Sequence, residues 1–170
     1  MSTATLTSVS EYLSTSYRPD CEYLEGELLE RNVGEWDHSE IQGIVFAYLF
    51  NRRREWGIQV LPEQRVQVKS TRFRVPDVCV VLRSHPREQI LTHPPFLCIE
   101  ILSKDDTMTT MYERIDDYLA FGVPYVWVLD PRTRRAWTFT PGEMHEAAGT
   151  LETANPAIQV PLSEVFLTEE

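Results

Sequence analysis

Three apolar runs between residues 74 and 130 decide the fold of this chain. They are RVPDVCVVL at residues 74–82, FLCIEIL at residues 96–102 and PYVWVLD at residues 124–130. Near-continuous apolarity over such lengths is typical of buried β-strands. Between the second and third runs, residues 109–121 carry apolar side chains at helical spacing, and Gly122 is suited to end that helix. A strand, a helix and a strand in this order predict a crossover unit whose two strands run parallel.

Two acidic residues are embedded in these apolar runs. Asp77 begins the hydrophobic part of the first run, and Glu100 lies between Ile99 and Ile101 in the second. An ionised carboxylate inside a strand is costly unless something pairs with it, and two neighbouring carboxylates repel unless a divalent cation lies between them. The pattern favours a metal site at Asp77 and Glu100. The alternative is that Asp77 ends a surface loop and Glu100 faces solvent on a half-exposed strand.

The rest of the chain predicts shorter elements around this centre. Residues 21–30 alternate well enough for two short strands joined at Glu25-Gly26, and residues 41–51 carry a helical apolar stripe. Residues 58–68 are expected to form a strand that Pro62-Glu63-Gln64 breaks near its start, and residues 73–82 the next strand, so that together they make a hairpin. That hairpin would place Arg65, Lys69, Arg72 and Arg74 on one edge or face of a sheet.

The composition is that of an ordinary globular protein. The 170 residues are 42% hydrophobic and 25% charged, which predicts one domain over residues 1–170 with a substantial core. No apolar run is long enough to span a bilayer, and residues 1–10 lack the features of a signal peptide, so we expect a cytoplasmic protein without membrane contact. Of three cysteines, Cys79 and Cys98 are expected to be buried thiols rather than zinc ligands or a disulfide.

The net charge of −10 argues against indiscriminate binding of nucleic acid, but the charges are unevenly distributed. Residues 41–87 carry nine basic and three acidic residues, whereas the segments on either side are strongly acidic. This basic block leads directly into Asp77 and predicts a phosphate-binding surface beside an acidic cleft. Its members expected to contact DNA are Arg52, Arg53, Arg54, Arg65, Lys69, Arg72 and Arg74. Two alternatives remain: solvated faces that segregate by chance, and arginines that merely suit a helix C-terminus.

The motifs together resemble a known family. They are Arg-Val-Pro-Asp-Val at residues 74–78, Ile-Glu-Ile-Leu-Ser at residues 99–103, and Tyr118 followed by Gly-Val-Pro at 122–124 and Trp-Val-Leu-Asp at 127–130. This pattern resembles the Uma-two family of restriction endonucleases, a branch of the PD-(D/E)XK nuclease superfamily, from about Val9 to Phe166. The resemblance implies an α/β (α+β) restriction-endonuclease-like core, with a mixed central sheet flanked by helices.

The resemblance also implies an activity. Proteins of this type are metal-dependent endonucleases that hydrolyse DNA phosphodiester bonds, and a homodimer is expected because cutting both strands needs two sites. Mg²⁺ (or Mn²⁺) would be held by Asp77, Glu100 and the backbone carbonyl of Ile101. A metal in such a site lowers the pKa of a bound water and polarises a phosphoryl oxygen.

Two further residues match positions that the family uses near its site. Glu22 matches an early acid and becomes a third candidate; the alternative is an exposed charge on an edge strand. His38 matches a histidine at the head of a helix, where it would contact a phosphate or shuttle a proton; the alternative is a surface or capping role.

The chain departs from the family in its basic residue. The superfamily lysine two positions after the glutamate is Leu102 here, and the lysine that the Uma-two pattern places four residues before the tyrosine is Arg114. Arginine keeps the charge but is a poorer group for proton transfer. Lys104 is a possible substitute cation. The family also tends to have an aspartate where this chain has Thr110.

Two classes of function therefore compete. The retained acids favour a metal-dependent endonuclease. Arg114 and the negative net charge favour a catalytically weak or inactive descendant that binds DNA or a protein partner. Hydrolysis of a smaller phosphodiester is compatible with the same residues.

Overall fold

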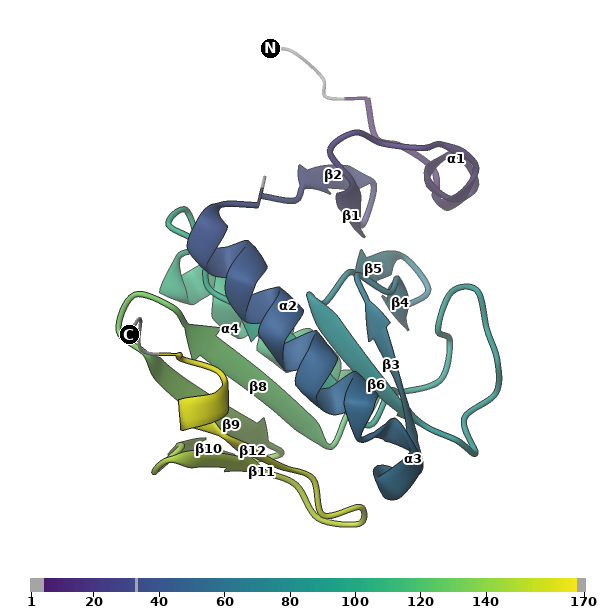
Figure 1. Ribbon diagram of the computed structural model, residues 1–170. Coiled ribbons are helices and arrows are strands. Elements are labelled where there is room, and N and C mark those ends of the chain that lie inside the picture. The colour runs from purple at the N-terminus through teal and green to yellow at the C-terminus, as the bar shows by residue number, and fades with distance from the viewer. Residues whose placement is uncertain (1–4, 33, 168–170) are drawn as a thin grey trace.

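The computed structural model describes residues 5–32 and 34–167, and its centre is a six-stranded mixed sheet (Figure 1). The strand order is β10-β9-β8-β7-β6-β3. The bounds are β3 Ile58–Pro62, β6 Val78–Leu82, β7 Leu97–Ile101, β8 Tyr125–Asp130, β9 Arg135–Thr140 and β10 Glu143–Glu146. β7 and β8 pair in parallel and are joined by α4 (Met108–Phe121), whereas the other neighbours pair antiparallel. The predicted crossover unit is confirmed.

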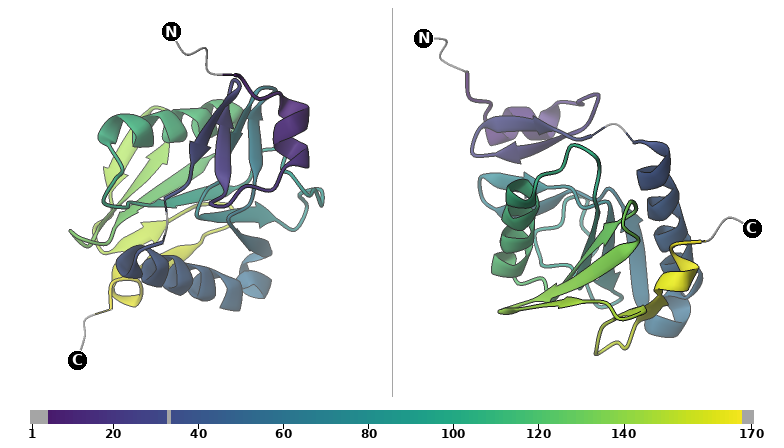
Figure 2. Two further views of the ribbon diagram at one scale, coloured as in Figure 1. Left: turned by 90° about the horizontal axis from the view of Figure 1, so that it is seen from above. Right: turned by 90° about the vertical axis from the view of Figure 1, so that its left-hand side faces the viewer.

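A helix covers each face of this main sheet, which explains why its strands are apolar on both faces. α2 (Trp36–Asn51), followed by the short α3 (Arg53–Trp56), and α4 lie on opposite faces (Figure 2). Alternate residues of a strand point to opposite faces, so Ile99 of β7 packs in the α2-side core, whereas Cys98 packs on the α4 side. The α4-side core also contains Cys79, Val126, Val128, Met111, Ile115 and Tyr118.

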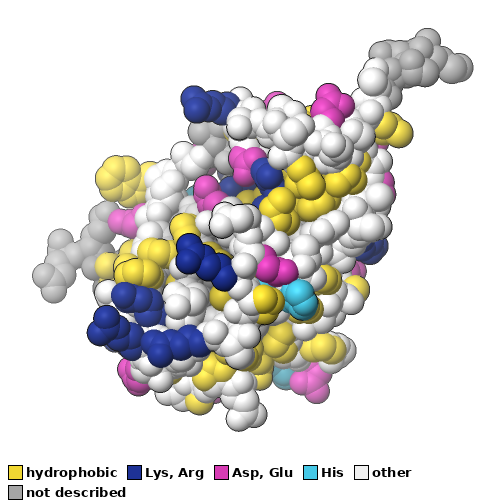
Figure 3. Space-filling model, turned by 90° about the vertical axis from the view of Figure 1, so that its right-hand side faces the viewer, with side chains coloured by type: hydrophobic (Ala, Val, Ile, Leu, Met, Phe, Trp, Pro, Cys, Tyr) yellow, Lys and Arg dark blue, Asp and Glu magenta, His cyan; other side chains and the backbone are white. Residues whose placement is uncertain are grey.

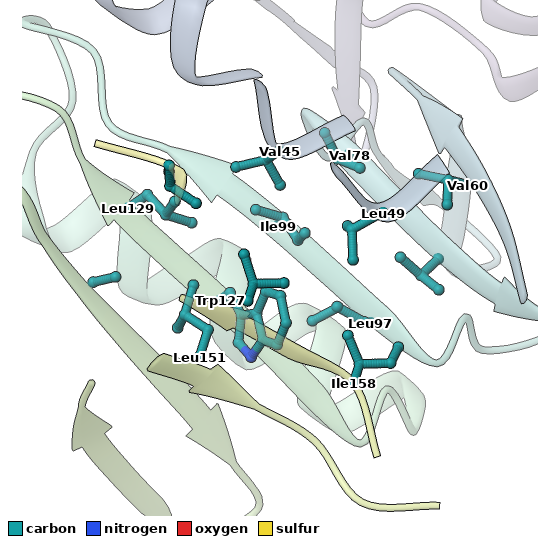
Figure 4. Packing of buried hydrophobic residues seen from close by; sticks show 14 of the residues in the cluster. Val45, Leu49, Val60, Val78, Leu97, Ile99, Trp127, Leu129, Leu151 and Ile158 are labelled. Atoms are coloured by element: carbon teal, nitrogen blue, oxygen red, sulfur yellow. The ribbon is translucent and has the colours of Figure 1, made fainter. Parts of the chain in front are cut away.

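The C-terminal segment completes the core on the α2 side. It forms β11 (Thr150–Glu152), β12 (Gln159–Pro161) and the 3₁₀ helix η1 (Leu162–Glu164). Leu151 and Ile158 of this segment lie beside Trp127 of β8 (Figure 4). The three cysteines are free and buried, and Cys79 lies directly opposite Cys98 in the pairing of β6 with β7.

A second sheet lies near the end of the main sheet where α2 begins (Figure 1). Its strand order is β2-β1-β5-β4. The bounds are β1 Cys21–Leu24, β2 Glu27–Glu30, β4 Val66–Lys69 and β5 Arg72–Arg74, with α1 (Val9–Ser14) packed beside them. Tyr12, Tyr23 and Phe73 form its core, and the Tyr12 hydroxyl donates a 2.7 Å hydrogen bond to the carbonyl of Cys21. The predicted pair of strands joined at Glu25-Gly26 is confirmed.

The two long strands expected over residues 58–68 and 73–82 are each divided between the two sheets. β3 belongs to the main sheet and β4 to the second sheet, and the chain turns between them at Glu63, whose φ is +49°. β5 and β6 are likewise separated by residues 75–77, where Pro76 has no N–H to donate to a ladder. The expected hairpin is confirmed, because Val66 opposite Arg74 continues the antiparallel register of Pro62 opposite Val78. The expectation of an unbroken strand over residues 73–82 is wrong, and the break places Asp77 at the end of the main sheet.

None of the helices in the described ranges is long and apolar enough to cross a membrane. The expectation for residues 1–10 falls partly outside the described residues.

Gly122 supplies a test of how α4 ends. Its φ of +109° is disfavoured for other residues, and an added Cβ would lie 3.2 Å from Cγ of Pro94. We predict that Gly122→Ala lowers the free energy of unfolding by about 1–2 kcal/mol. Gly43→Ala, in the exposed interior of α2 where a Cβ meets no atom within 4 Å, should raise it by up to about 1 kcal/mol. Urea denaturation measures both; equal effects would contradict this account.

Candidate active site

Asp77 and Glu100 occupy facing positions on neighbouring strands. β6 and β7 pair antiparallel with Val78 opposite Ile99, so the next pair along the same register is Asp77 and Glu100. Side chains directly opposite each other in an antiparallel pair lie on the same face of the sheet. Both carboxylates line one hollow of about 120 Å³, and we call it the acidic hollow. Its other lining side chains include Arg31, His38, Gln42, Glu63, Ile101, Asp106 and Arg114.

The Asp77 side chain is held from three directions. The backbone N–H of Ile101 donates to Oδ2 at 2.8 Å, and Nη2 of Arg31 donates to Oδ1 at 2.9 Å. Nε2 of His38 lies 3.2 Å from Oδ2, and the side-chain amide of Gln42 donates to the Asp77 backbone carbonyl at 3.0 Å. The alternative that Asp77 lies in an exposed loop is wrong, because the residue is only 5% exposed.

Glu100 is a buried carboxylate with a deficit of positive charge around it. It is 3% exposed, and the hydroxyl of Tyr118 donates to Oε1 at 2.6 Å. Burial raises the pKa of Glu100 from its ordinary 4.5 to about 8; Arg114 opposes this rise, and the negative charges of Asp77 and Glu22 add to it. A carboxyl group in this state needs a further cation if it is to be ionised at neutral pH.

Glu22 lies behind this pair and not on an exposed edge. Its Oε1 accepts a 3.0 Å hydrogen bond from the backbone N–H of Val75, and its Oε2 accepts one of 2.8 Å from Nη1 of Arg74. Nε of Arg114 is 3.5 Å from the same Oε2 atom. Glu22 therefore contributes negative charge near Glu100 while its own oxygens are already engaged.

A chain of alternating charges joins β1, β5 and α4 beneath the site. Arg74 is 1% exposed and bridges Glu22 to Asp117, whose Oδ2 accepts from Nε at 2.8 Å. Arg72 links the other Asp117 oxygen, at 2.9 Å, to Glu25, at 2.7 Å. The sequence-based role of Arg74 in contacting DNA is wrong, because a guanidinium enclosed by two carboxylates inside the protein cannot reach a phosphate. Asp117 was missed as a site-supporting residue because nothing in its local pattern distinguishes it from an exposed helical acid.

Arg114 reaches the acidic hollow from α4. Its Nη1 lies 3.3 Å from Oδ1 of Asp106, and its side chain is largely buried. Burial lowers the pKa of this guanidinium, but the carboxylates of Glu100, Glu22 and Asp106 outweigh that effect and raise it, so Arg114 stays charged. Asp106 also accepts from the backbone N–H of Ser103 at 2.7 Å and so fixes the loop after β7. Sequence reasoning overlooked Asp106.

The other candidates on α4 and its approach lie elsewhere. Lys104 is 62% exposed, pairs with Glu35, and does not line the acidic hollow. Leu102 packs against the α4-side core. Thr110 forms a capping box with Thr107 at the start of α4, which gives this position a structural role.

The remaining basic residues do not form one surface beside the site. Arg52 and Arg53 stack over Tyr48 and Phe50 at the far end of α2, about 20 Å along the helix from His38. Arg54 of α3 is exposed, and Figure 3 shows a group of Lys and Arg side chains at the lower left of the face that it displays. Arg65 pairs with Asp20 over the Tyr12 ring, and Lys69 is exposed at the end of β4.

The acidic hollow fits a hard divalent cation. Within residues 5–32 and 34–167, no group of three or more His, Cys, Asp and Glu is arranged to hold a metal. Mg²⁺, however, keeps several waters and is commonly bound through one or two carboxylates. Asp77 and Glu100 supply two, and Ile101 lies at the same strand end. Burial and the charges of Asp77 and Glu22 raise the pKa of Glu100, and a bound cation would favour its ionised form.

A mixed sheet between two helices, with acids at facing positions of adjacent strands, is the architecture of the restriction-endonuclease-like fold class. The chain belongs to the Uma2 family, described as "Putative restriction endonuclease", whose model matches residues 9–167. A crystal structure from Anabaena variabilis, described as "a putative nuclease belonging to DUF820", is similar with a TM-score of 0.80 and 24% identity. The similarity covers 92% of this chain and 96% of that one, and shows the same fold. No curated protein matches the sequence. The recognised family and fold class are confirmed.

The burial of Glu100 predicts a stability that depends on pH. Unfolded protein ionises this group near 4.5 and folded protein near 8, so stability falls as pH rises between these values and the full penalty persists above 8. We predict that Glu100→Gln is more stable than the wild type by about 2 kcal/mol or more at pH 8.5 without added metal, and by much less at pH 5. Denaturation curves at the two pH values measure the difference. Glu113→Gln, an exposed acid on α4, is the control, and an equal gain for both variants would contradict the prediction.

Proposed function

We propose that this protein is a metal-dependent endonuclease that hydrolyses DNA phosphodiester bonds at the acidic hollow. Asp77, Glu100 and the carbonyl of Ile101 would hold Mg²⁺ or Mn²⁺. The observation that carries the proposal is the facing position of Asp77 and Glu100, with Glu100 buried and short of positive charge. Membership of the Uma2 family supports it.

The protein's own residues have separate tasks in this proposal. The metal ion, when bound, lowers the pKa of a water and polarises a phosphoryl oxygen. The Ile101 N–H and the Tyr118 hydroxyl orient the two carboxylates, and Arg114 offers a permanent positive charge toward the phosphate. His38 lines the hollow, and its hydrogen bond with Asp77 raises its pKa, so it is suited to donate a proton to the leaving oxygen.

A second candidate function, a weak or inactive nuclease that binds DNA or a protein, has one observation in its favour. Among the described residues, the acidic hollow is lined by two arginines and no lysine. Arginine stabilises charge but handles protons poorly. DNA binding that depends on Mn²⁺ without cleavage would favour this second function.

Plasmid nicking by purified protein tests the proposal. With Mg²⁺ or Mn²⁺ we expect nicked or linear product, and Asp77→Asn and Glu100→Gln should each lower the rate by about a hundredfold or more. Asp116→Asn removes an exposed acid from α4 and should leave the rate unchanged.

Activity that survives equally in both site variants would belong to a contaminating nuclease and would contradict the proposal. A homodimer, which would bring two hollows to the two DNA strands, is a proposal that sedimentation of the active protein tests. A monomer that linearises plasmid without nicked intermediate would contradict it.

A further inference from the structure

Arg31 occupies the acidic hollow although no sequence motif marks it. It follows β2 directly, and its backbone N–H donates to the carbonyl of Asp20 at 2.9 Å, which fixes where the side chain starts. The guanidinium then bridges two acids: Nη2 is 2.9 Å from Oδ1 of Asp77, and Nη1 is 3.3 Å from Oε1 of Glu63. Its side chain is 16% exposed, so Arg31 is nearly as enclosed as Arg114.

The charges around Arg31 explain why it stays there. Burial lowers the pKa of its guanidinium, but Asp77, Glu63, Glu100 and Glu22 outweigh this and raise it. The guanidinium therefore supplies part of the positive charge that the buried acids need. It reaches the same carboxylate that a divalent cation would use, so the two cations compete for Asp77.

Of the two arginines in the hollow, Arg31 is the one that can move. Arg114 is anchored by Glu22 and Asp106, neither of which is a candidate metal ligand. Arg31 is held by the candidate ligand Asp77 and by Glu63, whose side chain is 55% exposed and so holds a cation weakly. Loss of the Asp77 contact would leave Arg31 lining the hollow with the N–H donors that faced Asp77 free. The guanidinium matches the oxygens of a phosphate.

We propose that Arg31 is a phosphate-binding residue that neutralises Asp77 in the resting protein and transfers to a backbone phosphate of the nucleic acid when a divalent cation takes its place. This inference rests on the proposed function and adds a residue to its substrate site. It makes metal and substrate binding cooperative, because Arg31 becomes available to the phosphate only after it leaves Asp77.

The experiment compares Arg31→Met, which keeps most of the side-chain length without the charge, with the wild type. Arg135→Met is the matched control, since Arg135 forms an exposed pair with Glu146 on β9. Mn²⁺ affinity without nucleic acid is measured by calorimetry. Because the competing guanidinium is gone, Arg31→Met should bind Mn²⁺ about tenfold more tightly, and Arg135→Met should match the wild type.

The second measurement is the affinity for a short fluorescent DNA duplex, by anisotropy on ice, in Mn²⁺ and in EDTA. Mn²⁺ should strengthen binding by the wild type, and Arg31→Met should lose about tenfold in the Mn²⁺ condition and little in EDTA. Opposite changes in metal and DNA affinity are the expected signature.

Unchanged Mn²⁺ affinity would overturn the proposal, because Arg31 would then not compete for Asp77. If Arg31→Met bound Mn²⁺ more tightly but DNA with unchanged affinity, the proposal would also be overturned, because Arg31 would then neutralise Asp77 without binding a phosphate. Failure of the proposed function gives a different result: wild-type protein would neither cleave plasmid nor gain DNA affinity from Mn²⁺. The Mn²⁺ titration of Arg31→Met would still show whether Arg31 and the cation compete for Asp77.

Discussion

The hydrogen bond from the Ile101 N–H to Asp77 is the contact on which the site depends. It ties the first residue before β6 to the last residue of β7, and so extends the pairing of these strands one step beyond their regular ladder. That step places two carboxylates on the same face of the sheet with α4 above them. The hollow, the charge deficit at Glu100 and the approach of Arg31 and Arg114 all follow from that placement.

Ion pairs and apolar packing together hold this end of the molecule. The apolar clusters hold α2 and α4 against the main sheet, and Val66 and Val68 of β4 belong to the α4-side cluster. Arg72, Arg74 and Asp117 add ion pairs between the second sheet and α4. Buried ion pairs of this type contribute little net stability compared with apolar residues of similar volume, yet breaking one is costly. Here they neutralise Glu22 and Asp117 through Arg74. Glu100 accepts only the Tyr118 hydroxyl among these contacts, so it is the carboxylate that a bound cation would stabilise most.

The sequence was sufficient to predict the strands and the helix whose apolar residues follow the spacing of a buried face. The apolar runs gave β6, β7, β8 and the crossover through α4, and the acids in those runs gave Asp77 and Glu100. It was insufficient where one apolar pattern serves two sheets. Pro62-Glu63-Gln64 indicated a break within residues 58–68 but not a change of sheet, and nothing in the apolar run of residues 73–82 indicated that β5 and β6 belong to different sheets. It also failed for arginines, because the partner of a long charged side chain is set by tertiary structure. Arg74 looked like a surface cation and is enclosed, and Arg31 carried no signal in a segment without a motif.

The three-residue connection between β5 and β6 has a consequence for how this protein tolerates change in length. Val75 is tied to Glu22 of the second sheet and Asp77 to Ile101 of the main sheet, so removing or adding one residue among Val75, Pro76 and Asp77 would force one sheet out of register and draw Asp77 away from Glu100. The connection from β6 to β7, by contrast, spans residues 83–96 and runs largely through exposed turns. Evolutionary insertions and deletions should therefore accumulate in the longer connection, while the shorter one keeps its count of residues even where their identities drift.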